Sequence, residues 1–282
     1  MRVIRSARQM AVVTQRLRRR GKRIGVVPTM GALHEGHLSL IRAAAAANDV
    51  VIVTIFVNPL QFGPREDFRH YPRNLARDIR LAGLAGADII FAPSAREIYP
   101  EGFGTVIDVG PIGECWEGRS RPGHFRGVAT VVAALFHLTK PTHAYFGQKD
   151  YQQTLVIRRL VDDLHLDVRL HVLPTVRERD GLAMSSRNGY LSVQQRRQAA
   201  VLWRALRAGR ARIRAGERRA ATIVSHMRRL IQEEPGARID YVAVVNAATL
   251  APVKRLRGRL ALLVAARVGR TRLIDNLLVD VS

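Results

Sequence analysis

The stretch from Ile24 to Ala44 constrains the fold of this chain more than any other. It opens with a short run rich in β-branched residues, Ile24–Val27, which ends before a proline and is typical of a buried strand. From Gly36 onward, leucine and isoleucine lead into an alanine run that indicates a helix. A strand, a glycine-bearing turn and a helix form the usual setting for a phosphate, because the helix start offers N–H groups and a positive dipole end.

Two histidines, His34 and His37, lie in this turn and can face the same anion. The pattern alone is a weak signal, because a histidine pair with this spacing also occurs as a metal pair or as two unrelated polar residues. Support for a site has to come from the rest of the chain.

The N-terminal part of the chain alternates strand and helix patterns. The run from Asp49 to Val57 is continuously apolar, as expected of a strand buried on both faces of a parallel sheet. Gln61 follows it, at the strand end where open α/β sheets bind ligands. The remaining elements are expected as helices over 1–23, 72–86, 128–138 and 150–165, and strands over 88–92, 105–109, 144–147 and 167–173. This alternation predicts an α/β fold with a doubly wound, Rossmann-like parallel sheet.

Past Pro174 the pattern changes. Arginine-rich helices are expected over 192–214 and 217–233, followed by strands over 239–245, 260–268 and 273–279. Helices followed by consecutive strands predict a smaller α+β domain. We therefore expect a Rossmann-like domain over 1–175 and a smaller lid domain over 176–282.

Composition limits the classes of protein. Cys115 is the single cysteine, which excludes an intrachain disulfide and fits a reducing cytoplasm. No apolar run approaches the 18 residues of a membrane span, and the N-terminus lacks a secretory-type apolar segment. We therefore predict a cytoplasmic protein with no membrane partner.

The formal net charge of +23 raises the question of a nucleic-acid partner. Only 4 of the 46 basic residues are lysines, and the arginines are dispersed, densest over 16–23 and 204–219, without interleaved aromatic residues. We predict that any nucleic-acid binding is weak and independent of sequence, and that it is lost between about 50 and 200 mM salt. No specific nucleic-acid partner is expected.

Several polar groups suit a phosphate and a small polyol acid. Lys149 follows a strand end beside Gly147, where an ammonium can neutralise phosphate oxygens. Gln61 and Gln153 are carboxamides that donate and accept. The loop 180–189 has adjacent hydroxyls and an arginine between glycines, which suits a mobile phosphate lid.

Six ordered motifs identify a resemblance: PTMGALHEGH at 28–37, FVNPLQFG at 56–63, YPRNLARD at 71–78, HFRGVATVV at 124–132, FGQKDYQQ at 146–153 and DGLAMSSRN at 180–188. Together they resemble the pantoate–β-alanine ligase (pantothenate synthetase) family, from about residue 24 to the C-terminus. The turn and the MSSR motif are also similar to the HIGH and KMSKS pair of nucleotidyl-transferring enzymes.

The resemblance implies a two-step reaction. ATP and (R)-pantoate give pantoyl adenylate and pyrophosphate, and β-alanine then displaces AMP to form pantothenate. It also implies Mg²⁺ on the phosphates and a homodimer. The first step builds negative charge on phosphorus, so cationic and N–H donors must be aimed there.

The resemblance also assigns roles to residues of this chain. His37 is the expected catalytic residue, Gln61 and Gln153 should hold pantoate against an apolar wall at Val131 and Val132, and Asp78 is a candidate Mg²⁺ ligand. Glutamine stands at position 148, where glutamate is common in the family. The expected ATP-binding residues are Met30, Gly31, Ala32, Leu33, His34, Glu35, Gly36, His37, Gly147, Gln148, Lys149, Asp150, Val176, Met184, Ser185, Ser186 and Arg187.

Two alternatives remain open from the residues. One is a related nucleotidyltransferase that leaves AMP on its product. The other is an arginine-rich nucleic-acid-binding protein on the same fold, against which the intact set of motifs argues.

Overall fold

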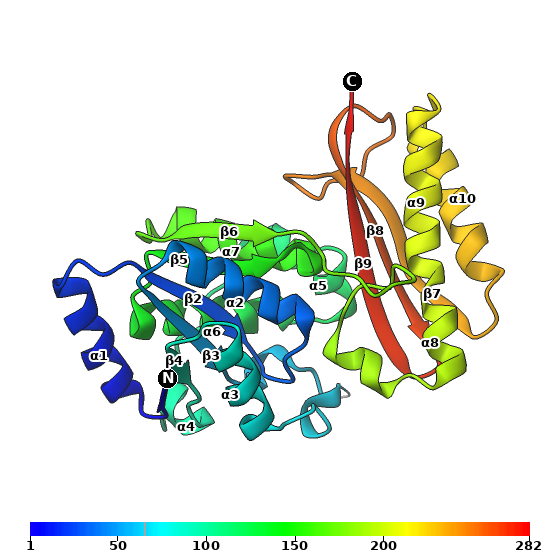
Figure 1. Cartoon of the computed structure of the whole chain (residues 1–282). Coiled ribbons are helices and arrows are strands. Elements are labelled where there is room, and N and C mark those ends of the chain that lie inside the picture. Colours follow the sequence, from blue (N-terminus) through cyan, green and yellow to red (C-terminus); the bar gives the residue numbers. More distant parts are fainter. Residues whose placement is uncertain (65) are drawn as a thin grey trace. The chain divides into compact units, whose positions relative to one another are not determined.

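The computed structural model describes residues 1–64 and 66–282 (Figure 1). The chain forms two compact units. The first comprises Met1–Gln148 and Gln152–Pro174, and the second comprises Lys149–Tyr151 and Thr175–Ser282. Each unit has its own hydrophobic core.

The first unit is built on a parallel six-stranded sheet in the order β1-β4-β3-β2-β5-β6. Its strands are β1 (Arg2–Ile4), β2 (Ile24–Thr29), β3 (Val50–Ile55), β4 (Ile89–Phe91), β5 (His143–Gly147) and β6 (Arg169–Leu173). Its helices are α1 (Ala7–Arg19), α2 (Glu35–Ala47), α3 (Leu75–Leu84), α4 (Ala95–Ile98), α5 (Glu117–Ser120), α6 (His124–Thr139) and α7 (Tyr151–Asp163). The expected doubly wound α/β fold is confirmed.

The side chains of alternate strand residues pack into two separate cores, one on each face of the sheet. Val26 packs with buried residues of α1, α6 and α7, whereas Val27 packs with those of α2 and α3. The sheet is therefore covered by helices on both faces, which explains why its strands are apolar throughout. No helix among the described residues is long and apolar enough to cross a membrane.

The sheet order places a topological switch point between β2 and β5. From β2 the chain moves outward through β3 and β4, whereas β5 and β6 lie on the other side of β2. The connections after β2 and β5 therefore leave neighbouring strands in opposite directions. In open α/β sheets a crevice for ligands forms outside the strand ends at such a point.

Some predictions of secondary structure in the first unit were wrong. The N-terminus begins with strand β1, which pairs with β4, so the region 1–23 is not one helix. No strand forms over 105–109, because Ile107 donates its N–H to Thr130 Oγ1 and Asp108 pairs with Arg126, both on α6. α3 begins at Leu75 rather than at Pro72, because Asn74 caps its N-terminus.

The second unit is a three-stranded antiparallel sheet covered by helices, as predicted. Its strands are β7 (Ala237–Asn246), β8 (Gly258–Val268) and β9 (Thr271–Val281), and its helices are α8 (Val193–Ala199), α9 (Val201–Arg214) and α10 (Ala220–Gln232). The region 192–214 is two helices rather than one, since α8 ends at Ala199 and α9 begins at Val201. Gly209 lets α9 approach α10 and β8 closely: a Cβ there would lie 2.7 Å from Met227 Sδ and 2.9 Å from Leu262 Cδ2.

Candidate active site

The turn after β2 is held by its own sequence in a conformation that few residues adopt. Gly31 and Ala32 have φ angles of +83° and +51°, in the left-handed region. The N–H of Gly31 donates to Thr29 Oγ1 at 3.1 Å, and that hydroxyl donates to the carbonyl of Thr54 on β3 at 2.6 Å. The turn is thus tied to both central strands before α2 begins.

Asp78 of α3 fixes the same turn by hydrogen bonds to its backbone. Its side chain is 1% exposed, and its two oxygens accept the N–H groups of Ala32 at 2.9 Å and Leu33 at 2.8 Å. Both carboxylate oxygens therefore already have backbone partners. This geometry does not favour the prediction that Asp78 binds Mg²⁺; it makes Asp78 a clamp on the turn.

Replacing Asp78 by asparagine tests this clamp. One of the two buried N–H groups would then face an amide N–H instead of an oxygen, and a buried donor without a partner costs about 1–3 kcal/mol. We expect Asp78→Asn to lower the free energy of unfolding by that amount in urea titrations, with the Mg²⁺ concentration for half-maximal activity unchanged. A large rise in the required Mg²⁺ at unchanged stability would support the metal role instead.

The two histidines form a reciprocal cap at the start of α2. His34 Nδ1 accepts the N–H of Gly36 at 3.1 Å, and His37 Nδ1 accepts the N–H of His34 at 3.4 Å. The rings lie with centroids 4.1 Å apart. A ring nitrogen that accepts carries no proton, so each neutral imidazole has its N–H at Nε2. The cap thereby sets the tautomer of both rings.

This arrangement differs from the expected phosphate turn in one respect. The N–H groups of Gly31, Ala32, Leu33, His34 and Gly36 all bond within the first unit, so they are not simple donors to a ligand. The side-chain donors of the turn are the two imidazoles, through Nε2. Glu35, the first residue of α2, pairs with Arg42 on the same helix.

Gln61 lies in the short 3₁₀ helix η1 (Pro59–Gln61) after β3, beside the turn. Its Nε2 lies 3.2 Å from Met30 Sδ, so the structure brings these two predicted site residues together. A thioether is a weak acceptor. The side chain of Gln61 is nevertheless buried, at 8% exposed.

Gln153 lies in the first turn of α7, next to a glutamine with a different task. Gln152 is buried and ties the irregular segment before α5 to α7, through the carbonyls of Ile112 and Cys115 and the N–H of Glu117. Gln153 is half-buried. Adjacent carboxamides thus face different surroundings, and Gln153 is the one that suits a ligand.

Sequence reasoning missed the residues that hold Gln61 in place. The carbonyl of Gln61 accepts from His124 Nδ1 at 2.9 Å and from Arg121 at 3.3 Å, and Arg121 forms a bidentate ion pair with Glu66. Burial lowers the pKa of His124 to about 4, with the nearby guanidinium adding to the effect. His124 is therefore neutral at pH 7, with its proton on Nδ1 toward Gln61. The HFRG motif that starts at 124 was the available signal.

In the second unit, the segment after β5 is bonded to β9 and to the end of β7. Asn276 donates to the carbonyl of Lys149 at 2.9 Å, and the hydroxyl of Tyr151 donates to the carbonyl of Ala247 at 2.6 Å. Lys149 Nζ lies 3.3 Å from Asp150 Oδ1. Gly147 ends β5, and Gln148 opens the 3₁₀ helix η4 (Gln148–Asp150).

The MSSR motif follows a small hairpin of the second unit. The N–H of Met184 donates to the carbonyl of Val176 at 3.0 Å, so these two predicted nucleotide contacts are paired with each other. Ser185 caps the 3₁₀ helix η5 (Ser186–Tyr190) by accepting the N–H of Arg187 at 3.3 Å.

Ion pairs fix this hairpin to the rest of the second unit. Arg177 forms a bidentate pair with Asp275 of β9, at 2.6 and 2.9 Å, and its guanidinium lies 3.7 Å from the ring centroid of Trp203. Arg196 of α8 bonds to Glu178 and Asp180. The segment predicted as a mobile lid is therefore firmly bonded within its own unit.

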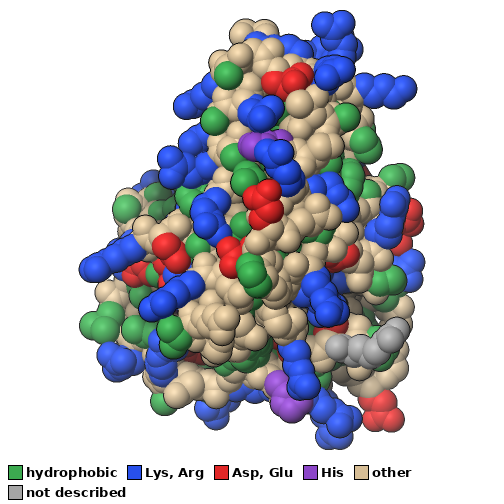
Figure 2. Space-filling model, turned by 90° about the vertical axis from the view of Figure 1, so that its right-hand side faces the viewer, with side chains coloured by type: hydrophobic (Ala, Val, Ile, Leu, Met, Phe, Trp, Pro, Cys, Tyr) green, Lys and Arg blue, Asp and Glu red, His purple; other side chains and the backbone are tan. Residues whose placement is uncertain are grey.

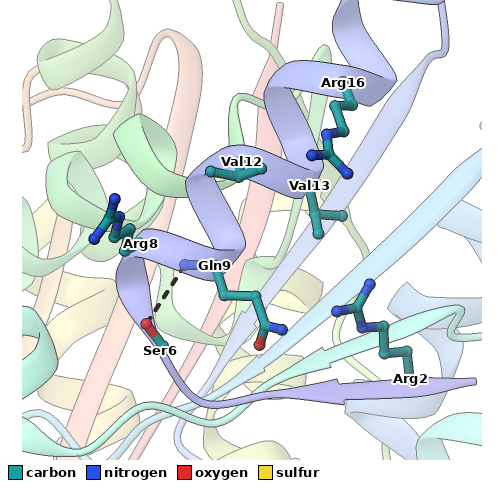
Figure 3. Close-up of a pocket in the computed structure, with 7 residues that line it drawn as sticks. All are labelled: Arg2, Ser6, Arg8, Gln9, Val12, Val13 and Arg16. Carbon is teal, nitrogen blue, oxygen red and sulfur yellow. Dashed lines mark hydrogen bonds between the residues drawn. The ribbon is translucent and has the colours of Figure 1, made fainter.

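Two other surface features are less suited to a reaction. A hollow of about 370 Å³ lies along α1 and the edge strand β1, and β4 and β3 separate β1 from β2. In Figure 3 its arginines do not converge on one point. On the face shown in Figure 2, basic side chains are spread with acidic ones between them. Within residues 1–64 and 66–282, no cluster of three or more His, Cys, Asp or Glu side chains could hold a metal.

A doubly wound parallel sheet with a histidine-bearing turn at its switch point defines the class of α/β nucleotide-binding enzymes. A model of the pantoate-beta-alanine ligase family matches residues 2–278, and the chain belongs to this family. It is 56% identical to pantothenate synthetase from Moorella thermoacetica (94% of both chains) and 54% identical to that from Heliobacterium modesticaldum (100% of both). The resemblance inferred from the motifs is confirmed.

Solved structures agree with this assignment. The crystal structure of pantothenate synthetase from Thermus thermophilus has a TM-score of 0.94 at 48% identity, with 98% of this chain and 99% of that chain covered. The ligase from Francisella tularensis, complexed with beta-gamma ATP and beta-alanine, has a TM-score of 0.80 at 36% identity, with 99% and 97% covered. The comparisons favour a ligase over both alternatives left open by the sequence.

Proposed function

We propose that this chain condenses (R)-pantoate with β-alanine through a pantoyl-adenylate intermediate, releasing pyrophosphate and AMP. The single observation that carries the proposal is the family match over residues 2–278. The complex of the Francisella relative with a nucleotide and beta-alanine supports ATP and β-alanine as ligands here. Pantoate follows from the family's reaction.

The roles of individual residues are part of this proposal. The Nε2–H groups of His34 and His37 stabilise charge that develops on the α-phosphate, with His37 as the catalytic residue. Gln61 and Gln153 bind pantoate. The turn 30–37 and the residues Gly147–Asp150, Val176 and Met184–Arg187 bind ATP, with Lys149 and Arg187 neutralising phosphate oxygens.

Mg²⁺ is proposed as a companion of ATP rather than as a resident metal. Both oxygens of Asp78 hold backbone N–H groups, and Asp150 lies beside Lys149. Mg²⁺ usually keeps several waters and binds through substrate phosphates with few protein carboxylates. The residues present fit that mode, with the Asp150 carboxylate beside Lys149 as the proposed protein ligand, and the ion would neutralise phosphate charge there.

Isotope exchange between pyrophosphate and ATP is the direct test of the proposed reaction. Without β-alanine, exchange should occur and should require pantoate, because the adenylate forms reversibly. With β-alanine, the products should be AMP and pantothenate. Exchange without pantoate, or ADP as a product, would contradict the proposal.

A homodimer and a cytoplasmic location remain predictions. The dimer is implied by the family, and the reducing compartment follows from the single cysteine. Burial raises the pKa of the Cys115 thiol, which makes it a poor nucleophile.

A further inference from the structure

Gln61 is held by a chain of side-chain hydrogen bonds that begins at Tyr99. The phenol of Tyr99, the residue that follows α4, donates to Asn58 Oδ1 at 2.7 Å. Asn58 Nδ2 in turn lies 3.0 Å from Gln61 Oε1. One continuous chain of hydrogen bonds thus connects Tyr99 to two residues of the loop after β3.

The orientation of the Asn58 amide is fully determined by its partners. The side chain is 1% exposed and makes four hydrogen bonds. Its oxygen accepts from Tyr99 and from the N–H of Leu60, at 3.2 Å, and its nitrogen donates to Gln61 Oε1 and to the carbonyl of Gly127, at 3.0 Å. Four bonds use the full capacity of an asparagine side chain. A flipped amide would turn its N–H groups toward the N–H of Leu60 and its oxygen toward the carbonyl of Gly127, and Tyr99 would lose the oxygen to which it donates.

The Asn58 orientation decides which atoms Gln61 presents. Because Gln61 Oε1 already accepts from Asn58, the Gln61 amide must point its N–H groups toward Met30 and the turn after β2. The backbone carbonyl of Gln61 is fixed as well, by His124 and Arg121. Gln61 therefore offers donors to a ligand, and those donors have only a thioether as their partner in the described residues.

Tyr99 is suited to act as a permanent donor at the start of this chain. Its ring packs near Phe56 and Phe103, with centroids 6.0 and 4.9 Å away. Burial raises the pKa of the Tyr99 phenol above its usual range, so the phenol keeps its proton at neutral pH. Apolar neighbours also mean that a phenylalanine fits the same space.

We propose that Tyr99 is a positioning residue for the pantoate site: through Asn58 it fixes the Gln61 amide as a donor toward a carboxylate or hydroxyl oxygen of the acid substrate. The inference rests on the proposed function, and it concerns the acid alone. ATP and β-alanine binding do not depend on the direction of this amide.

The test compares Tyr99→Phe with the matched control Tyr145→Phe. Tyr145 is also buried, and its hydroxyl bonds to an asparagine amide, Asn48 Nδ2 at 2.8 Å, on the other face of the sheet. We expect Tyr99→Phe to raise the KM for pantoate by about threefold to tenfold, the loss typical of one net hydrogen bond. The KM for ATP should not change. Tyr145→Phe should leave both constants unchanged.

Asn58→Asp gives a directional second test. A carboxylate cannot donate, so the Gln61 amide would turn its N–H groups toward position 58 and present its oxygen to the acid. The pantoate KM should then rise more than in Tyr99→Phe. An unchanged pantoate KM in folded Tyr99→Phe, or an equal rise in the ATP constant, would overturn the inference. If the wild-type protein lacks pantoate-dependent exchange, the proposed function fails instead.

Discussion

Replacement of His37 by alanine should lower the rate of adenylate formation by about 10²–10³-fold, the loss typical of one donor to charge that develops in a transition state. The structure adds a reason for the choice of His37. Its Nδ1 accepts the N–H of His34, so its proton lies on Nε2 and the ring is a donor in its neutral form. Single-turnover measurement of adenylate would follow the step directly.

His37→Ala requires a control, because it removes both the Nδ1 acceptor that caps α2 and the Nε2–H donor. Asparagine places its oxygen near the position of Nδ1 and has nothing at the position of Nε2. His37→Asn should therefore keep most of the helix cap, which is worth about 0.5–2 kcal/mol, and still lose adenylation. Glutamine, whose amide reaches the position of Nε2, should retain more activity than asparagine.

A ground-state contact should behave differently. Gln153→Ala should raise the KM for pantoate and lower the single-turnover rate at saturation much less, because the contact is present in both ground and transition states. If His37→Ala changed only the pantoate KM while Gln153→Ala abolished adenylation, the roles assigned to these residues would have to be exchanged.

The sequence predicted the fold well because its signals are local and repeated. Continuously apolar segments, such as those that form β3 and α6, predict a sheet that is covered on both faces. The failures have local causes too. β1 has only three residues and is defined by its pairing with β4. The region 105–109 is rich in β-branched residues, as a strand would be, but it bonds to side chains of α6 instead of to another strand.

The site was predictable in its residue types and not in its bonding. The turn after β2 was found from its glycines and histidines. The clamp by Asp78 comes from 45 residues further along the chain, and the Tyr99–Asn58 link spans 41. No spacing rule connects such residues, because their proximity follows from the sheet order. Asp78 is an example: its carboxylate is recognisable in the sequence, but its bonds to the N–H groups of Ala32 and Leu33 are not.

The largest stability effect in the second unit should come from Asp275→Ala, with a loss of about 3–5 kcal/mol in the free energy of unfolding. The Asp275 side chain is 1% exposed, and its two oxygens hold the Arg177 guanidinium. Removal of the carboxylate leaves Arg177 charged, mostly buried against Trp203, and without its partner. Urea unfolding followed by tryptophan fluorescence, which includes Trp203, would measure the loss.

Two further variants distinguish the effect of breaking the buried Arg177–Asp275 pair from the effect of losing one surface charge. Asp280, on the same strand, pairs with Arg259 at 3.9 Å with both side chains mostly exposed, so Asp280→Ala should cost at most about 1 kcal/mol. The double variant Arg177→Met with Asp275→Leu should be more stable than Asp275→Ala alone, because no buried charge is left unpaired. If Asp275→Ala were no more destabilising than Asp280→Ala, the hairpin before Met184 would not depend on this ion pair.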